Sequence, residues 1–173
     1  MNQRKEAVTM GGNPLTLLGP ELETGVPAPD FEVLNTRLEP VTLAASKGKV
    51  RVFSVVPSLD TPVCDTQTRR FDEYADELGD EVAVYTVSAD LPFAAARWCT
   101  ANGVEHLQCL SDHRGMSFGN AYGTHVEELR LDARAVFVVD RNDRIVHVQY
   151  VKELTEEPDY EAVVEAARIA AGS

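Results

Sequence analysis

Apolar residues in the middle of the chain follow two alternating patterns. Continuous apolar runs rich in β-branched residues, at residues 50–56 and 82–88, predict strands that are buried on both faces of a sheet. After each run, apolar residues recur every three or four positions, which predicts amphipathic helices over residues 65–78 and 91–101. This order is typical of a βαβ unit, so the two strands are expected to be parallel neighbours with a right-handed crossover.

Turn and cap residues separate these elements. Pro57 ends the first strand, and Gly79 and Gly103 follow the two helices, where glycine commonly closes a helix. Asp90 is the expected N-cap of the second helix, because its carboxylate can accept a hydrogen bond from a free N–H of the first turn. Pro92 fits that turn, which needs no backbone donor from it.

Shorter elements flank this unit. They are expected strands at 31–34, 40–43 and 107–110, a helix near 115–122, a hairpin of strands 135–139 and 145–151, and a helix from Pro158 to about residue 170. A βαβ half followed by a ββα half is the thioredoxin-type arrangement. We therefore predict an α/β protein with a thioredoxin-like fold, in which helices flank a central mixed sheet.

The N-terminal segment precedes this sheet and has turn residues of its own. The tetrapeptide Gly11-Gly12-Asn13-Pro14 predicts a β-hairpin extension over about residues 7–20. The chain has 173 residues, of which 44% are hydrophobic, which suffices for one buried core. No linker is apparent, so we expect a single domain over residues 1–173.

The chain is acidic, with 28 Asp and Glu against 16 Lys and Arg and a net charge of −12. This charge repels phosphate backbones and anionic lipids, so we expect neither nucleic acid nor a membrane as a partner. No apolar run reaches the roughly 18 residues of a membrane-spanning helix, and no apolar region of a secretory signal follows the N-terminus. We expect a soluble protein of a reducing compartment, the cytoplasm.

Three cysteines, Cys64, Cys99 and Cys109, give an odd count that argues against a framework of structural disulfides. Their spacing contains no C-x-x-C pair, so no metal site is expected. Cys109 lies in a short apolar strand and is interpreted as a core residue. Four histidines are expected at the surface or in turns: His106, His113, His125 and His147.

Cys64 ends the octapeptide Pro57-Ser58-Leu59-Asp60-Thr61-Pro62-Val63-Cys64, between a buried strand and an amphipathic helix. In the first turn of that helix, free backbone N–H groups and the helix dipole favour a thiolate. Placement alone leaves a second interpretation open, in which Cys64 is a small buried apolar residue. In the same way, Thr61 alone could be a loop or N-cap hydroxyl, and Arg134 a surface cation.

The pattern P-x-x-x-T-x-x-C in this octapeptide is the active-site signature of the peroxiredoxins, and longer segments resemble their thiol peroxidase branch, the atypical two-cysteine type. These segments are residues 57–71 (PSLDTPVCDTQTRRF), 87–99 (VSADLPFAAARWC), 133–140 (ARAVFVVD) and 153–160 (ELTEEPDY). The resemblance implies a peroxidase of antioxidant defence that reduces hydrogen peroxide and organic hydroperoxides. It implies no cofactor, a homodimer, and thioredoxin as the reductant.

The resemblance also assigns a role to each matching position. Cys64 is the expected peroxidatic cysteine, which becomes a sulfenic acid, and Cys99 is the resolving cysteine, which forms an intramolecular disulfide with it. Thr61 is expected to contact the thiolate and orient the peroxide. Pro57 is expected to shield the pocket from water, and Arg134 to support the thiolate and the developing charge.

Two other functions use related chemistry. A disulfide oxidoreductase fits the fold, but position 61 is Thr, so the C-x-x-C pair of such enzymes is absent. A redox sensor that passes oxidation to a protein partner uses the same Cys64 chemistry; a resolving cysteine in the same chain favours turnover. Cys99 lies about eight residues into its predicted helix, roughly 12 Å from the start of that helix, so a disulfide with Cys64 is expected to require local unfolding.

Overall fold

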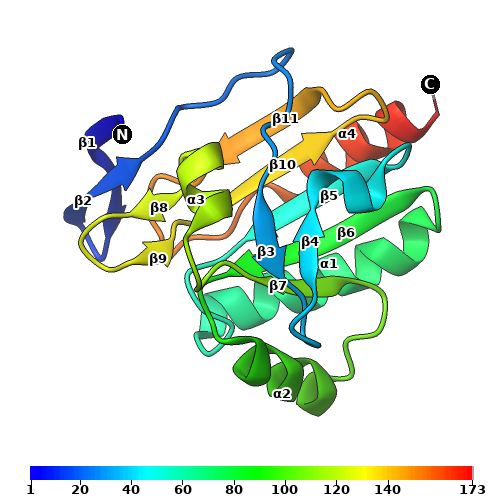
Figure 1. Ribbon diagram of the computed structural model, residues 1–173, viewed down its shortest axis with the longest axis horizontal. Helices are drawn as coiled ribbons and strands as arrows, with labels where there is room; N and C mark the ends of the chain where they lie inside the picture. The colour runs from blue at the N-terminus through cyan, green and yellow to red at the C-terminus, as the bar shows by residue number, and fades with distance from the viewer. Residues whose placement is uncertain (173) are drawn as a thin grey trace.

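A computed structural model describes residues 1–172 of the chain (Figure 1). Its largest sheet has seven strands in the order β11-β10-β5-β6-β7-β3-β4. The strands are β3 (Glu32–Leu34), β4 (Pro40–Thr42), β5 (Val50–Val55), β6 (Val82–Ser88), β7 (Gln108–Ser111), β10 (Ala135–Val139) and β11 (Ile145–Tyr150). β6 pairs in parallel with β5 and β7, and the remaining pairs are antiparallel. The predicted mixed sheet and its parallel βαβ unit are confirmed.

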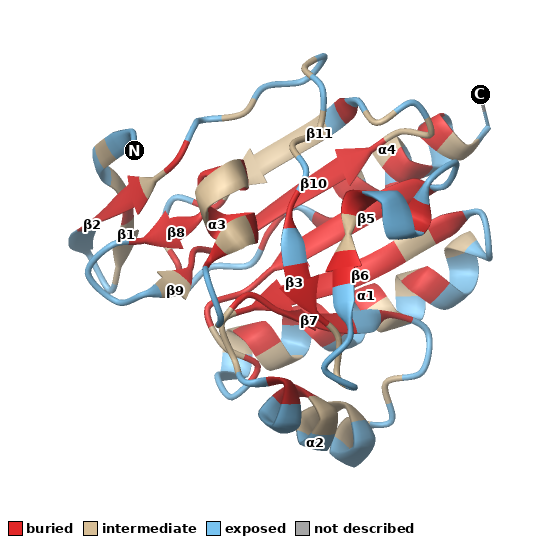
Figure 2. Cartoon of the chain, viewed as in Figure 1, coloured by how far each residue is buried: buried red, intermediate tan, exposed pale blue. Residues whose placement is uncertain are grey.

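Helices cover both faces of this sheet (Figure 1). One face packs against α1 (Pro62–Leu78), α2 (Pro92–Asn102) and α4 (Tyr160–Ala171). The opposite face packs against α3 (Ser117–Tyr122), and a short 3-10 helix, η1 (Leu43–Ser46), follows β4. Figure 2 shows why β5, β6 and β10 read as apolar runs, because they are buried almost throughout.

Two helix starts differ from the prediction. α1 begins at Pro62, three residues before the predicted start, because a proline with its fixed φ angle suits the first helical position. α2 begins at Pro92 with Leu91 as its N-cap residue, so the prediction of Asp90 as N-cap was wrong. The Asp90 carboxylate instead accepts hydrogen bonds from the loop before α1.

The expected N-terminal hairpin is present and begins earlier, with β1 (Gln3–Met10) paired to β2 (Asn13–Leu18). It joins β8 (His125–Val126) and β9 (Leu131–Asp132) in a second, four-stranded sheet. These two-residue strands were not predicted, since two residues carry no periodicity. His125 is buried at 9% exposure, so its prediction as a surface or turn residue was wrong: desolvation in this sheet lowers its pKa.

The hairpin is attached to the loop between β11 and α4. The Thr9 N–H donates to the carbonyl of Lys152 (2.7 Å), and the Leu154 N–H donates to the carbonyl of Thr9 (2.8 Å). The Glu153 carboxylate accepts from the N–H groups of Gly11 and Gly12 at the hairpin turn. These hydrogen bonds fix the backbone around Leu154. Across residues 1–172, no helix combines the length and apolar character needed to cross a membrane.

Candidate active site

Cys64 lies where the chain turns from the carboxyl end of β5 into α1. It is the third residue of that helix and has no exposed surface. The first N–H groups of a helix have no intrahelical acceptor and carry the positive end of the helix dipole, so this position favours negative charge on the sulfur. Asp65, which follows directly, pairs with Arg69 one turn along the helix at 3.1 Å, and its charge is thus partly balanced.

Arg134, which directly precedes β10, contacts the Cys64 sulfur. Its Nη2 donates to Cys64 Sγ at 3.3 Å, and the side chain is only 2% exposed. Nε and Nη2 also donate to the carbonyl of Leu154 (3.0 and 2.8 Å), and Nη1 donates to Gln67 Oε1 (2.8 Å). The guanidinium is therefore held from three sides with its charge against the thiol.

These partners of Arg134 include no carboxylate. The other fully buried arginine, Arg51, pairs with the carboxylate of Asp143. Within residues 1–172, Arg134 forms no ion pair, and its neutral partners are a carbonyl and an amide oxygen. A buried cation without an anion is costly, so the Cys64 thiolate is the charge that this geometry best accommodates.

Gln67 links the arginine to the sheet. Its Nε2 donates to the hydroxyl of Ser54 on β5 at 2.8 Å, and both residues are fully buried. Because the amide nitrogen is engaged by Ser54, the amide oxygen must face Arg134. This role of Gln67 was not predicted. The available signal was an amide three residues after Cys64, on the helix face that also carries Phe71 and Ala75.

Thr61 and Pro57 lie between β5 and α1. The expected contact between the Thr61 hydroxyl and the Cys64 sulfur is not among the hydrogen bonds of residues 1–172. The Thr61 hydroxyl donates to the carbonyl of Ser58 at 3.0 Å, and Pro57 is buried. Thr61 is the N-cap residue of α1, but its side chain makes no capping hydrogen bond. With its hydrogen given to Ser58, the hydroxyl oxygen can act toward a substrate as an acceptor.

Asp90 holds this loop in place. Its carboxylate accepts from the Ser58 hydroxyl (2.7 Å), the Leu59 N–H (2.8 Å) and the Ser88 hydroxyl (2.7 Å). The loop is thereby tied to the end of β6, the strand next to β5. The local capping pattern predicts this carboxylate at the start of α2, whereas its partners in the fold come from the loop before α1 and from β6.

Cys99 is in the last turn of α2 and is partly exposed, whereas Cys109 on β7 is 4% exposed. The prediction of Cys109 as a core residue is confirmed. The two sulfurs are 2.7 Å apart, a contact that the sequence did not indicate. The hydrogen bond between the two thiols lowers the pKa of Cys99 and raises that of Cys109. All three cysteines are free thiols in this structure.

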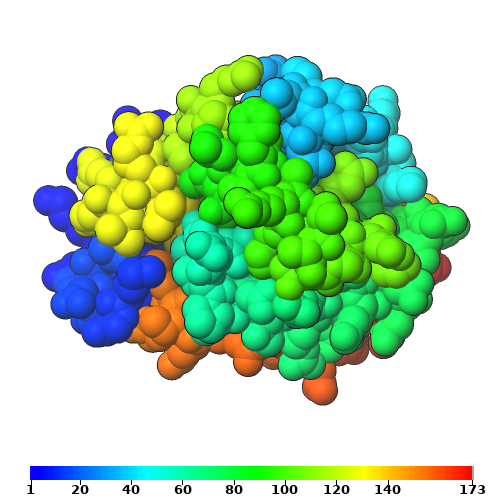
Figure 3. All heavy atoms as spheres, turned by 90° about the horizontal axis from the view of Figure 1, so that it is seen from below, coloured from blue at the N-terminus to red at the C-terminus, as the bar shows by residue number. Residues whose placement is uncertain are grey.

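The starts of α1 and α2 share one face of the molecule. Figure 3 shows the teal residues at the start of α1 beside the green residues of α2. A hollow of about 750 Å³ lies between the loop before α1 and the outer side of α2. Leu91 and Phe93 line it and are 52% and 68% exposed, so the surface next to the Cys64 loop is apolar.

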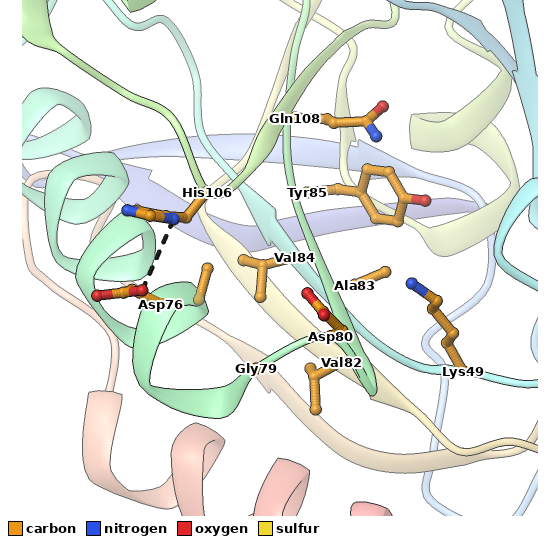
Figure 4. A pocket seen from close by; sticks show the side chains of 11 residues that line it. Lys49, Asp76, Gly79, Asp80, Val82, Ala83, Val84, Tyr85, His106 and Gln108 are labelled. Carbon is orange, nitrogen blue, oxygen red and sulfur yellow. Dashed lines mark ion pairs between the residues drawn. The ribbon is translucent and has the colours of Figure 1, made fainter.

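A second hollow, of about 230 Å³, lies at the opposite edge of the sheet (Figure 4). Lys49 and Val82 at the amino ends of β5 and β6 line it, and an Asp76–His106 ion pair of 3.8 Å borders it. It holds no cysteine, and the carboxyl end of β5 leads away from it toward Cys64. It is therefore separate from the thiol site.

A mixed sheet with a buried, arginine-supported cysteine at a helix start defines a thioredoxin-like protein with a thiol active site. The family model described as Redoxin matches residues 23–164. The thiol peroxidase of Bacillus subtilis (strain 168) is 57% identical over 161 residues, which cover 93% of this chain and 96% of that one. The thiol peroxidase of Listeria innocua serovar 6a is 53% identical over 161 residues, 93% of this chain and 97% of that one.

Solved structures agree with these relatives. A peroxiredoxin-like protein from Aquifex aeolicus superimposes with a TM-score of 0.89 at 38% identity, covering 95% of this chain and 97% of that chain. The chain belongs to the Redoxin family. Its resemblance to the thiol peroxidase branch of the peroxiredoxins, and the thioredoxin-like fold expected from the residue pattern, are confirmed.

Proposed function

We propose that the chain is a thiol-dependent peroxidase that reduces hydrogen peroxide and organic hydroperoxides, with Cys64 as its nucleophile. Thiol-dependent peroxide reduction is the activity that the thiol peroxidase relatives support. The observation that carries the assignment to Cys64 is the Arg134 guanidinium, buried without a carboxylate and 3.3 Å from Sγ.

In the first step, the Cys64 thiolate attacks one peroxide oxygen, the O–O bond breaks, and the other oxygen leaves as water or alcohol after taking up a proton. Cys64 becomes a sulfenic acid and the peroxide is reduced by two electrons. Negative charge moves from sulfur to the departing oxygen, so a fixed cation beside both atoms stabilises the transition state. We assign the Thr61 oxygen as the acceptor of a hydrogen bond from the peroxide O–H.

In the second step, the Cys99 thiolate attacks the sulfenic sulfur, the Cys64–Cys99 disulfide forms, the S–O bond breaks, and the departing hydroxide takes up a proton from solvent to become water. The lowered pKa of Cys99, caused by the Cys109 hydrogen bond, increases the fraction of attacking thiolate. Cys64 is fully buried against Arg134 and Cys99 contacts Cys109, so this step needs local unfolding of a helix segment. A thioredoxin then reduces the disulfide.

The test is intact-mass and peptide mapping of reduced protein after one equivalent of hydrogen peroxide. We expect a disulfide that contains Cys99 in the parent and a trappable Cys64 sulfenic acid in Cys99→Ser. Cys64→Ser, the matched control, should not consume peroxide at the rate of the parent protein. A Cys64 that remains a thiol would refute the proposal. If Cys64 is oxidised but thioredoxin and its reductase sustain no turnover, a redox-sensor function replaces the peroxidase.

Two features of the proposal concern assembly and location. We place the protein in the cytoplasm as a homodimer, in line with the family resemblance, and the exposed side chains of Leu91 and Phe93 supply apolar surface beside the site. Light scattering after size exclusion measures the dimer, and Phe93→Glu should weaken it if this surface is the interface. A monomeric mass at micromolar concentration would exclude the dimer.

A further inference from the structure

Cys99 and Cys109 form a close thiol pair on the helix-covered face of the sheet. Their sulfurs are 2.7 Å apart, and a disulfide requires about 2.05 Å, so bonding needs an approach of roughly 0.7 Å. α2 packs directly on β7 to bring them together. By contrast, the Cys64 sulfur accepts a hydrogen bond from Arg134, and Cys64 has no exposed surface for a reductant to reach.

The three cysteines belong to one layer of the molecule. Strand register aligns Ser54, Thr86 and Cys109 on neighbouring strands, and about 4.8 Å separates each strand from the next. Ser54 accepts a hydrogen bond from Gln67, and Gln67 accepts one from Arg134, the arginine that contacts Cys64. The aligned strand positions therefore connect the surroundings of Cys64 with Cys109. Cys64 and Cys109 lie in the same core cluster, and Cys99 packs against it.

The space beside the pair is open. A hollow of about 400 Å³ is lined by both Cys99 and Cys109, together with Ala96, Val104 and Arg37. The Arg37 side chain is 79% exposed. A disulfide between Cys99 and Cys109 is thus accessible from solvent in the folded protein, whereas one involving the buried Cys64 is accessible only while a helix segment is displaced.

We infer that Cys109 is a second resolving cysteine: it takes over Cys99 from the Cys64–Cys99 disulfide, so that a Cys99–Cys109 disulfide is the oxidised form presented to the reductant. This inference rests on the proposed function. The Cys109 thiolate attacks Sγ of Cys99, the Cys99–Cys109 bond forms, and the Cys64–Cys99 bond breaks. Cys64 leaves as the thiolate beside Arg134, and the Cys109 proton passes to solvent. No electrons enter or leave in this exchange.

The hydrogen bond between the pair sets the order of these steps. When Cys99 is the thiolate, the Cys109 thiol donates to it across the 2.7 Å contact, which lowers the pKa of Cys99 and raises that of Cys109, so Cys99 attacks first. Once Cys99 is bonded to Cys64, its negative charge is gone and so is its hydrogen bond with Cys109. Two causes that raise the pKa of Cys109 then disappear, and burial and the charges of Asp72 and Asp90 remain. The adjacent Thr86 hydroxyl, buried without a partner among residues 1–172, can donate to the new thiolate.

Leaving-group chemistry favours the same direction. In thiol–disulfide exchange, the better leaving sulfur departs faster, and a thiolate stabilised by a cation is the better leaving group. Attack on Cys99 releases Cys64 toward the Arg134 guanidinium. The exchange also lets α1 and α2 return to their folded positions, because the bond moves to two sulfurs that are already in contact in the folded state.

The experiment follows the disulfides over time. Reduced full-length protein receives one equivalent of hydrogen peroxide, samples are quenched in acid and alkylated, and disulfide-linked peptides are quantified. We expect a Cys64–Cys99 peptide first and a Cys99–Cys109 peptide afterwards, with Cys64 alkylated in the final product. A parent protein that ends as Cys64–Cys99 with Cys109 alkylated overturns this inference and leaves the proposed function intact.

Two variants separate the possible routes. Cys109→Ser, with Cys109→Ala as a second choice if the first does not fold, should stop at the Cys64–Cys99 disulfide. Cys64→Ser should form no Cys99–Cys109 disulfide on the same timescale. If it forms one as fast as the parent, the pair is oxidised independently and the transfer is refuted. If Cys64 is never oxidised in the parent, the proposed function itself fails, a result distinct from the other two.

Discussion

Replacement of Arg134 by Met tests whether the buried guanidinium drives the attack on peroxide. Methionine fills a similar volume without charge. At 3.3 Å between Nη2 and Sγ, two unit charges interact by about 5 kcal/mol with an effective dielectric constant of ~20. Part of that charge is already engaged by Leu154 and Gln67. If half of the interaction acts on the transition state, about 2.5 kcal/mol is lost, which corresponds to roughly a 70-fold slower reaction.

The same substitution also affects stability. It removes the donors from two buried acceptors, the Leu154 carbonyl and Gln67 Oε1, at about 1–3 kcal/mol each. Arg134→Lys retains the charge but not the planar fork that serves these acceptors, so we expect its rate to lie between those of the parent and the Met variant. Arg70→Met, which removes an exposed arginine of α1 that stacks on Tyr160, is the control for loss of one positive charge.

Stopped-flow fluorescence provides the assay. Trp98 is the only tryptophan and precedes Cys99, so its emission reports on the end of α2 as the disulfide forms. The second-order rate constant is taken from the dependence on peroxide concentration, with folding checked by near-ultraviolet circular dichroism. A folded Arg134→Met variant that reacts within threefold of the parent, as Arg70→Met should, refutes the electrostatic role.

Three further predictions concern carboxylates. Asp90→Ala should slow peroxide reduction even at temperatures where the variant is fully folded, because it frees Ser58 and the Leu59 N–H at the loop before Cys64. Asp90→Asn should recover part of the rate. Hydrogen bonds from the Thr155 N–H, the Gly12 N–H and the Thr155 hydroxyl lower the pKa of Glu153 to about 2, so its contribution to stability is present above about pH 4.5 and is lost as pH falls toward 2. Glu153→Gln should abolish that part of the acid dependence in thermal unfolding between pH 6 and 2. Burial raises the pKa of Asp132, so the folded state binds more protons than the unfolded state and stability falls as pH rises above about 4. Asp132→Asn should gain in melting temperature relative to the parent as pH increases, and a constant difference would contradict this assignment.

The sequence predicted the long elements well because their residue patterns reflect burial that the sheet imposes. The run over residues 50–56 corresponds to β5, and the run over 82–88 to β6, since both are enclosed by helices on two faces. β8 and β9 escaped prediction because two-residue strands are specified by their partners in the fold. His125 was misplaced for the same reason, as its burial comes from the second sheet.

In the candidate site too, local features follow from the sequence, whereas contacts between distant residues do not. Cys64 at a helix start follows from local order along the chain, since a buried strand, a loop and an amphipathic helix are consecutive. The environment of Cys64 does not follow from local order, because Arg134 lies 70 residues away along the chain. It reaches the sulfur through the antiparallel pairing of β10 with β5. The same holds for Cys99 and Cys109, whose contact depends on how α2 packs on β7.

The N-terminal hairpin acquires a role from this arrangement. Its Thr9 exchanges backbone hydrogen bonds with Lys152 and Leu154, and the Leu154 carbonyl in turn accepts two hydrogen bonds from Arg134. A buried guanidinium without a carboxylate keeps its position only if neutral acceptors are fixed around it. Because the hairpin fixes one acceptor and the Gln67–Ser54 pair fixes the other, the thiolate of Cys64 remains the anion that completes the site.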